Sequence, residues 1–172
     1  MIYVARKISK AKWELKPEFI SELSKEAIPA DAITADLRTQ RNRLSLWKFE
    51  DESALEEVVL ALATRMQRLD KIDIVWTEFE LLISKGLKYE ETEGETPVRN
   101  LKDRHIDLIN LDVKRLEEIA IILADSIRNN KPPKVKRFAK NKVREILQQG
   151  LREERFSPDN LSENLRRDLR LG

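Results

Sequence analysis

Cysteine is absent from the 172-residue chain. This excludes disulfide bonds, thiolate nucleophiles and metal sites with sulfur ligands. The single histidine, His105, leaves little material for a metal site built on imidazole or for acid–base chemistry. Nucleophile-elbow, zincin and phosphate-loop motifs are missing as well. We therefore predict no metal, no cofactor and no catalytic residues, and we expect a protein of the reducing cytoplasm that binds rather than catalyses.

Long apolar runs are also missing from the sequence. No stretch approaches the roughly 18 consecutive apolar residues that a membrane span requires. The first residues, Met1 to Lys7, lack the apolar core of a signal peptide. We therefore expect an intracellular protein without membrane partners.

Charge is abundant but unevenly placed. Charged residues make up 37% of the chain and hydrophobic residues 41%, so a core is possible and the helices should have strongly solvated faces. Residues 131–172 hold twelve basic and six acidic side chains, a net charge of +6, whereas the remaining residues have a net charge of −4. This asymmetry indicates a separate role for the C-terminal part.

Alternation of apolar and polar residues predicts the strands. One strand is expected over residues 2–8, and a hairpin is expected to pair residues 32–39 with 43–49 around a polar turn at Asn42. Further strands are expected at 72–76 and 87–89. The acidic tract 90–97 is expected to be an exposed loop.

Helical spacing of apolar residues predicts two main helices. The first should run over residues 53–69, with Ser53 and Glu56 forming a capping box, and the second over 112–129 with Asp112 as N-cap. Short helices are expected between Pro17 and Pro29 and over residues 78–85. We expect one core to contain Leu37, Leu44, Leu46, Val58, Leu62, Leu116, Ala120 and Leu123.

The pair Pro132-Pro133 interrupts the helical pattern and predicts a domain boundary. The sequence thus favours an α+β domain over residues 1–130, in which a small antiparallel sheet of about four strands packs with the two main helices. A basic helical appendage should follow over residues 131–172. Apolar residues from Val135 to Leu147 predict its first helix, and Ser157-Pro158 opens its last.

The C-terminal helices carry the leading functional hypothesis. Leucines at four-residue spacing form a narrow stripe flanked by arginines, and such a stripe either docks on its own domain or fits a groove of a partner. The chain is accordingly predicted to be an assembly subunit of a larger complex that binds another protein or a second copy of itself. The predicted partner-binding residues are Leu161, Leu165, Arg166, Leu169 and Arg170.

A basic run supports an alternative function. Six cations occur between residues 134 and 144 with no acidic residue among them. If this segment is helical, four of them lie opposite the apolar stripe and could contact a nucleic-acid backbone: Lys134, Arg137, Lys140 and Arg144. The plainer interpretation is a solvated face that balances an acidic body.

Two further clusters allow a third, enzymatic hypothesis. Asp36 and the arginines at 38, 41 and 43 could clamp a phosphate or carboxylate at the predicted hairpin, although an exposed polar turn is the plainer interpretation. In residues 103–107 the alternation could align two carboxylates with His105. A histidine that simply satisfies its hydrogen bonds is the plainer interpretation there.

Overall fold

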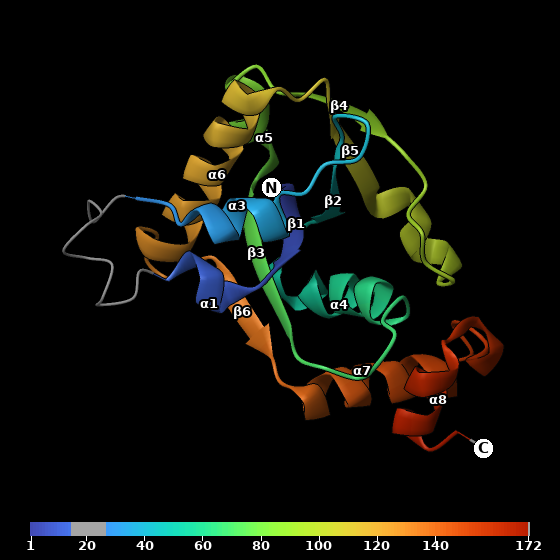
Figure 1. Ribbon diagram of the computed structural model, residues 1–172. Helices are drawn as coiled ribbons and strands as arrows, with labels where there is room; N and C mark the ends of the chain where they lie inside the picture. The colour runs from blue at the N-terminus through green and yellow to red at the C-terminus, as the bar shows by residue number, and fades with distance from the viewer. Residues whose placement is uncertain (15–26, 172) are drawn as a thin grey trace.

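A six-stranded sheet runs through the centre of the molecule, with helices against both of its faces (Figure 1). The computed structural model describes residues 1–14 and 27–171. All neighbouring strands of this sheet pair antiparallel, and the strand order is β4-β5-β2-β1-β3-β6. The predicted α+β fold with an antiparallel sheet is confirmed, but the sheet has six strands instead of about four. Most of the helix predicted between Pro17 and Pro29 lies outside the described residues.

The strands at the centre of the sheet come from the beginning of the chain. β1 pairs with β2 on one side and with β3 on the other, and Tyr3 lies opposite both Phe49 and Glu78. β4 and β6 form the two edges. The strands predicted at 2–8 and 72–76 are confirmed. The bounds are β1 Tyr3–Ile8, β2 Leu44–Phe49, β3 Ile72–Glu78, β4 Lys88–Glu91, β5 His105–Ile109 and β6 Val135–Phe138.

One face of the sheet, here called the α6 face, is covered by α6 (Val113–Arg128). As predicted, the Asp112 carboxylate caps this helix and accepts a hydrogen bond from the Arg115 amide at 2.8 Å. Three short helices complete the layer: α1 (Lys10–Trp13), α3 (Ala30–Asp36) and α5 (Phe79–Ser84). Helical and strand side chains interdigitate there, among them Ile119, Leu123, Leu44, Leu46, Val75 and Leu108.

The opposite face, here called the α4 face, is covered by α4 (Leu55–Ala63), α7 (Lys140–Arg152) and α8 (Glu163–Leu169). Short 3-10 helices η1 (Glu52–Ala54), η2 (Arg99–Arg104) and η3 (Pro158–Asn160) connect these parts. The sheet therefore separates two cores, and the prediction of a single core is wrong. Val58 lies in the core of the α4 face and Leu37 in that of the α6 face, while Leu62 is only half-buried.

The first half of the predicted hairpin is the helix α3 and not a strand. Ile33 and Leu37 are four residues apart, so their spacing fits a helix as well as a strand. Packing decides between the two, because Leu37 and Ala32 are buried against the α6 face. The turn into β2 is short: Gln40 pairs with Arg43, and the two residues between them have φ of 53° and 58°.

The helix predicted over residues 53–69 is shorter than expected. The side-chain cap belongs to η1: the Asp51 carboxylate accepts a hydrogen bond from the Ser53 amide at 2.9 Å, so Ser53 lies inside η1 and is not the cap. α4 has no side-chain cap of its own. The helix ends at Ala63, and the Thr64 hydroxyl then donates to the Ala61 carbonyl at 2.9 Å. That hydroxyl also contacts the hydroxyl of Thr96, which draws the chain away from the helical path.

The segment after Pro133 begins as a strand, and the helix predicted from Val135 starts only at Lys140. β6 pairs with β3, where Phe138 lies opposite Ile72 and Val135 opposite Val75. Val135 packs on the α6 face and Phe138 on the α4 face, as side chains an odd number of residues apart do in a strand. Independent folding of residues 1–130 stays a prediction; residues 131–171 supply the sixth strand and part of the core beneath α4.

Among the described residues, no helix combines the length and apolar character needed to cross a membrane.

Candidate functional site

The four cations of the predicted nucleic-acid face lie on two different elements. Lys134 and Arg137 are at β6, whereas Lys140 and Arg144 are on α7. The Lys134 ammonium lies 2.8 Å from a Glu78 carboxylate oxygen. Arg137 forms two hydrogen bonds with Asp73, at 2.7 and 2.9 Å. Two of the four cations are thus engaged within the chain.

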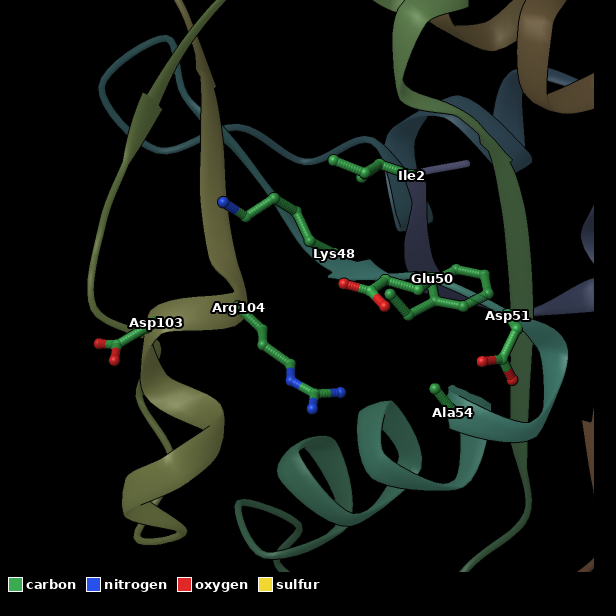
Figure 2. A pocket seen from close by; sticks show the side chains of 8 residues that line it. Ile2, Lys48, Glu50, Asp51, Ala54, Asp103 and Arg104 are labelled. Atoms are coloured by element: carbon green, nitrogen blue, oxygen red, sulfur yellow. The ribbon is translucent and has the colours of Figure 1, made fainter.

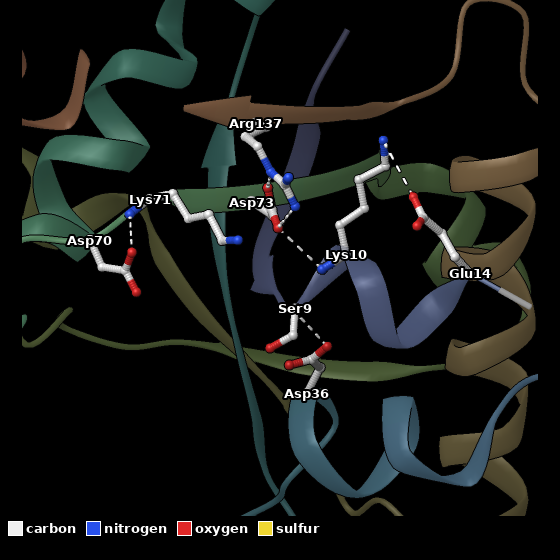
Figure 3. A network of polar contacts seen from close by, with 8 residues as sticks. All are labelled: Ser9, Lys10, Glu14, Asp36, Asp70, Lys71, Asp73 and Arg137. Atoms are coloured by element: carbon white, nitrogen blue, oxygen red, sulfur yellow. Dashed lines mark hydrogen bonds and ion pairs between the residues drawn. The ribbon is translucent and has the colours of Figure 1, made fainter. Parts of the chain in front are cut away.

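Asp73 and Arg137 anchor the edge strand (Figure 3). The Asp73 side chain is buried and also accepts a hydrogen bond from the Lys10 amide at 3.2 Å. Burial alone would raise the pKa of Asp73, but the hydrogen bonds and charge of Arg137 outweigh it and hold this pKa below its ordinary value. The same contact raises the pKa of Arg137. Arg137 therefore fastens β6 to β3.

Five basic side chains of the C-terminal segment form ion pairs with carboxylates elsewhere in the chain. Arg155 and Glu57 form a paired contact with two hydrogen bonds, at 2.8 and 2.5 Å. Hydrogen bonding from Arg155 lowers the pKa of Glu57 against the effect of burial. The five ion pairs that join the basic C-terminal segment to the acidic body are Lys134–Glu78, Lys136–Glu52, Arg137–Asp73, Lys142–Glu56 and Arg155–Glu57.

The predicted leucine stripe is docked on its own chain. Leu161, Leu165 and Leu169 are 4%, 0% and 4% exposed and belong to the core of the α4 face. Asp168 on the same helix accepts a hydrogen bond from the Leu69 amide at 3.0 Å, which fixes α8 beneath the end of α4. Of the two alternatives, the structure shows docking, so these leucines do not offer a surface to a partner. Their neighbours Arg166 and Arg170 remain at the surface.

The outer face of α7 carries the cations that remain. Val143, Ile146 and Leu147 turn inward and are buried. Lys140, Arg144 and Arg152, spaced by four and then eight residues, follow a ridge that winds by roughly 120° around the helix, from the edge of the buried side to the outer side; we call these three residues the α7 stripe. No carboxylate of the described residues lies within ion-pair distance of them. The stripe spans about 18 Å along the helix axis.

Glycine makes the close seating of α7 possible. A Cβ atom on Gly150 would lie 2.7 Å from the Phe156 ring and 3.1 Å from Leu60. Any larger residue at this position would push α7 away from α4. Sequence reasoning missed Arg152 as a site residue, although its spacing of eight from Arg144 is visible in the sequence.

The predicted Asp/Arg cluster does not form one site. Asp36 turns inward, where its carboxylate accepts hydrogen bonds from the Ser9 amide and the Trp13 indole, each at 2.8 Å. Arg43 instead contacts Glu90 on β4 at 2.7 Å. These side chains engage different partners, so their contacts are structural.

A cavity of about 420 Å³ opens where β2 ends beside η2 (Figure 2). Arg104 reaches into it toward Ala54, and Lys48 and Glu50 border it. Lys48 is already paired with Glu91 at 2.6 Å. No carboxylate of the described residues lies within ion-pair distance of Arg104, although Glu50, Asp51 and Asp103 also line the cavity.

His105 lies on β5 with its ring against Trp47, edge to face, at 5.1 Å between centroids. Asp107 lies on the same side of the strand, as the alternation predicts, whereas Asp103 belongs to η2. Among residues 1–14 and 27–171, no three histidine, aspartate or glutamate side chains come together to hold a metal ion.

Comparisons of the chain with protein-family models, with curated proteins and with solved structures give no match.

Proposed function

We propose that this protein is an assembly subunit that binds an acidic surface of a partner protein through the outer face of α7. The α7 stripe carries the proposal. Lys140, Arg144 and Arg152 present three cations along one winding ridge of the helix, and no carboxylate of the described residues lies within ion-pair distance of them. In this proposal the partner contacts the α7 stripe and not Leu161, Leu165 and Leu169, which were predicted to bind it.

The rigidity of α7 supports this role. The helix is fixed by its buried apolar side and by the Lys142–Glu56 and Arg155–Glu57 pairs at its two ends. A partner therefore meets cations on an ordered backbone, and only side-chain freedom is lost on binding. Arginine is enriched at protein interfaces because its planar fork and its apolar stem both find contacts. An acidic partner surface would also speed the encounter.

Nucleic acid is the second candidate, favoured by the free state of Lys140 and Arg144. One observation favours a protein partner over it. Lys134 and Arg137 are engaged with Glu78 and Asp73.

The test reverses the charge of the stripe with the triple change Lys140→Glu, Arg144→Glu and Arg152→Glu. The matched control reverses three exposed lysines elsewhere, Lys12, Lys85 and Lys114. Cross-linked complexes are purified from the native host after nuclease treatment. We expect the stripe variant to lose a protein partner that the control retains, with both variants melting as the wild type does.

The same proteins are titrated with mixed-sequence DNA and RNA over a range of salt concentrations. If phosphates are the ligand, binding is lost on nuclease treatment, and the stripe variant flattens the slope of log K against log salt by up to about three units. A nuclease-resistant complex that survives in the stripe variant would refute the proposed interface.

A further inference from the structure

A second cavity lies at the end of the α4 face that the helices leave open. β2 and β5 bury Leu44, Leu46, Ile106 and Leu108 on the α6 face. Their other side bears polar groups, and the last turn of α4 and residues 92–97 wall it in. This open cavity is about 400 Å³, within the range of small-ligand pockets. Its main lining residues are Trp47, Leu62, Arg65, Glu93, His105 and Asp107.

The wall formed by residues 92–97 is fixed, and the prediction of an exposed loop holds only for its acidic side chains. Gly94 is buried against Trp47, and a Cβ atom there would lie 2.4 Å from the indole ring. The Gly94 amide donates to the Lys102 carbonyl at 3.0 Å. The hydroxyl of Thr96, which is 5% exposed, contacts that of Thr64 at 3.2 Å. The cavity is therefore a built feature of the fold.

A chain of hydrogen bonds orients the histidine in this cavity. Asp107 accepts from the Ser45 hydroxyl at 2.9 Å and from the Thr92 hydroxyl at 3.4 Å, and His105 Nδ1 lies 2.7 Å from the Thr92 oxygen. A carboxylate only accepts, and Thr92 has one hydroxyl proton. All three groups are satisfied when Nδ1–H donates to Thr92 and Thr92 donates to Asp107. We assign this tautomer from the network, which leaves a lone pair on Nε2.

Nε2 of His105 is the unpaired end of this series of hydrogen bonds. His105 is 9% exposed, and Nε2 forms no hydrogen bond with any described residue. No described side chain has a nitrogen or oxygen that is both sealed from solvent and unpaired, so Nε2 is reached by solvent, and His105 lines the cavity. Burial holds the pKa of His105 below its ordinary value, against the opposing charges of Asp107 and Glu95, so the ring is neutral at pH 7.

We propose that this cavity binds a small organic cation, a primary amine or a guanidinium. The groups that face it are acceptors: His105 Nε2, the Asp107 carboxylate and, at its rim, Glu93 and Glu95. Each of the three carboxylates has one cationic neighbour: Arg43 lies 3.9 Å from Asp107, Lys102 3.7 Å from Glu93 and Arg65 3.4 Å from Glu95. These contacts are long and solvated, so carboxylate oxygens stay open to a ligand cation. The Trp47 indole and Leu62 supply an apolar wall for a short aliphatic stem. The described residues hold no three-ligand metal cluster, so an organic cation fits this acceptor set better than a metal ion.

The probe is agmatine, which carries one guanidinium and one amine, and the opposite-charge control is succinate. Binding is followed by calorimetry and by the indole N–H signal of Trp47, assigned with Trp47→Phe. We expect saturable binding of agmatine that shifts this signal, and none of succinate. Asp107→Asn should weaken agmatine by roughly tenfold or more, since it removes the buried charge.

Asp107→Asn also removes a hydrogen-bond partner of Thr92, so a second variant keeps the test independent of folding. Glu93→Gln with Glu95→Gln alters only the exposed rim and should weaken agmatine by about threefold to tenfold. Its matched control, Glu80→Gln with Glu117→Gln on the α6 face, and the α7 stripe variant should bind as the wild type does. Failure of agmatine to saturate, equal binding of succinate, or unchanged binding in the rim variant would overturn the proposal.

Discussion

The two sides of β2 and β5 differ more than any other neighbouring surfaces of this molecule. Toward α6 the strands present Leu46, Ile106 and Leu108, which are 3%, 0% and 0% exposed. Toward α4 the same strands present Ser45, His105 and Asp107, joined through hydroxyl groups. The side toward α6 therefore contributes to the stability of the fold. The side toward α4 is only partly covered and can form a binding site. Alternation within a single strand separates the two roles.

The largest expected effect concerns how much of the α4 face depends on the end of the chain. Removing residues 156–172 takes away the buried side chains of Phe156, Leu161, Leu165 and Leu169. The loss should exceed the roughly 2–5 kcal/mol of a single buried Leu→Ala change and should lower the stability of the whole described fold. Urea unfolding followed by circular dichroism measures it. A truncated protein as stable as the full chain would show that α8 is a separate unit and would support a domain boundary near residue 131.

A smaller effect compares neighbours on the two sides of the sheet. Ile106→Ala should destabilise the protein by about 2–5 kcal/mol, because it leaves a cavity in the core of the α6 face. Ser45→Ala, on the polar side, should cost about 1 kcal/mol, since it removes one hydrogen bond to a carboxylate that retains others. Equal costs at the two positions would contradict the division of roles.

The smallest expected effect is a pH dependence of stability. The pKa of His105 is lower in the folded state than its ordinary value of about 6.5, so below that value the unfolded chain takes up a proton first. The contribution of neutral His105 is therefore complete above the ordinary pKa and declines as the pH falls from about 7 toward the folded pKa.

The measurement is straightforward because His105 is the only histidine in the chain. Urea unfolding at pH 7.5 and pH 5.5 should show a loss of stability at the lower pH that His105→Gln largely removes. Identical pH dependence in the two proteins would mean that the ring is not held in its neutral form.

Elements whose signals are local were predictable from the sequence. The strands at 2–8 and 72–76 follow from alternation and a continuous apolar run, and α6 follows from its apolar face and the Asp112 cap. α3 was not predictable, because Ile33 and Leu37 fit both periods and packing decides between them. β6 was missed because its partner β3 precedes it by some sixty residues, and no local pattern records that pairing.

The candidate sites divide in the same way. Alternation places His105 and Asp107 on one side of a strand, and the structure confirms this arrangement. The cavity around them depends on contacts between distant segments, such as Gly94 with Trp47 and Thr96 with Thr64, which no spacing reveals. The basic run was visible, but the carboxylates that neutralise Lys134 and Arg137 lie on β3, far away in the sequence.

The seating of α7 against α4 has a consequence for the order of synthesis. The side of α4 that carries Leu60, which lies against Gly150 of α7, emerges from the ribosome well before its cover. α7 begins roughly 75 residues after α4 ends, so at about 5–20 residues per second the nascent chain displays that surface for roughly 4–15 s. During this interval the growing chain offers a chaperone an apolar helix that the finished protein hides.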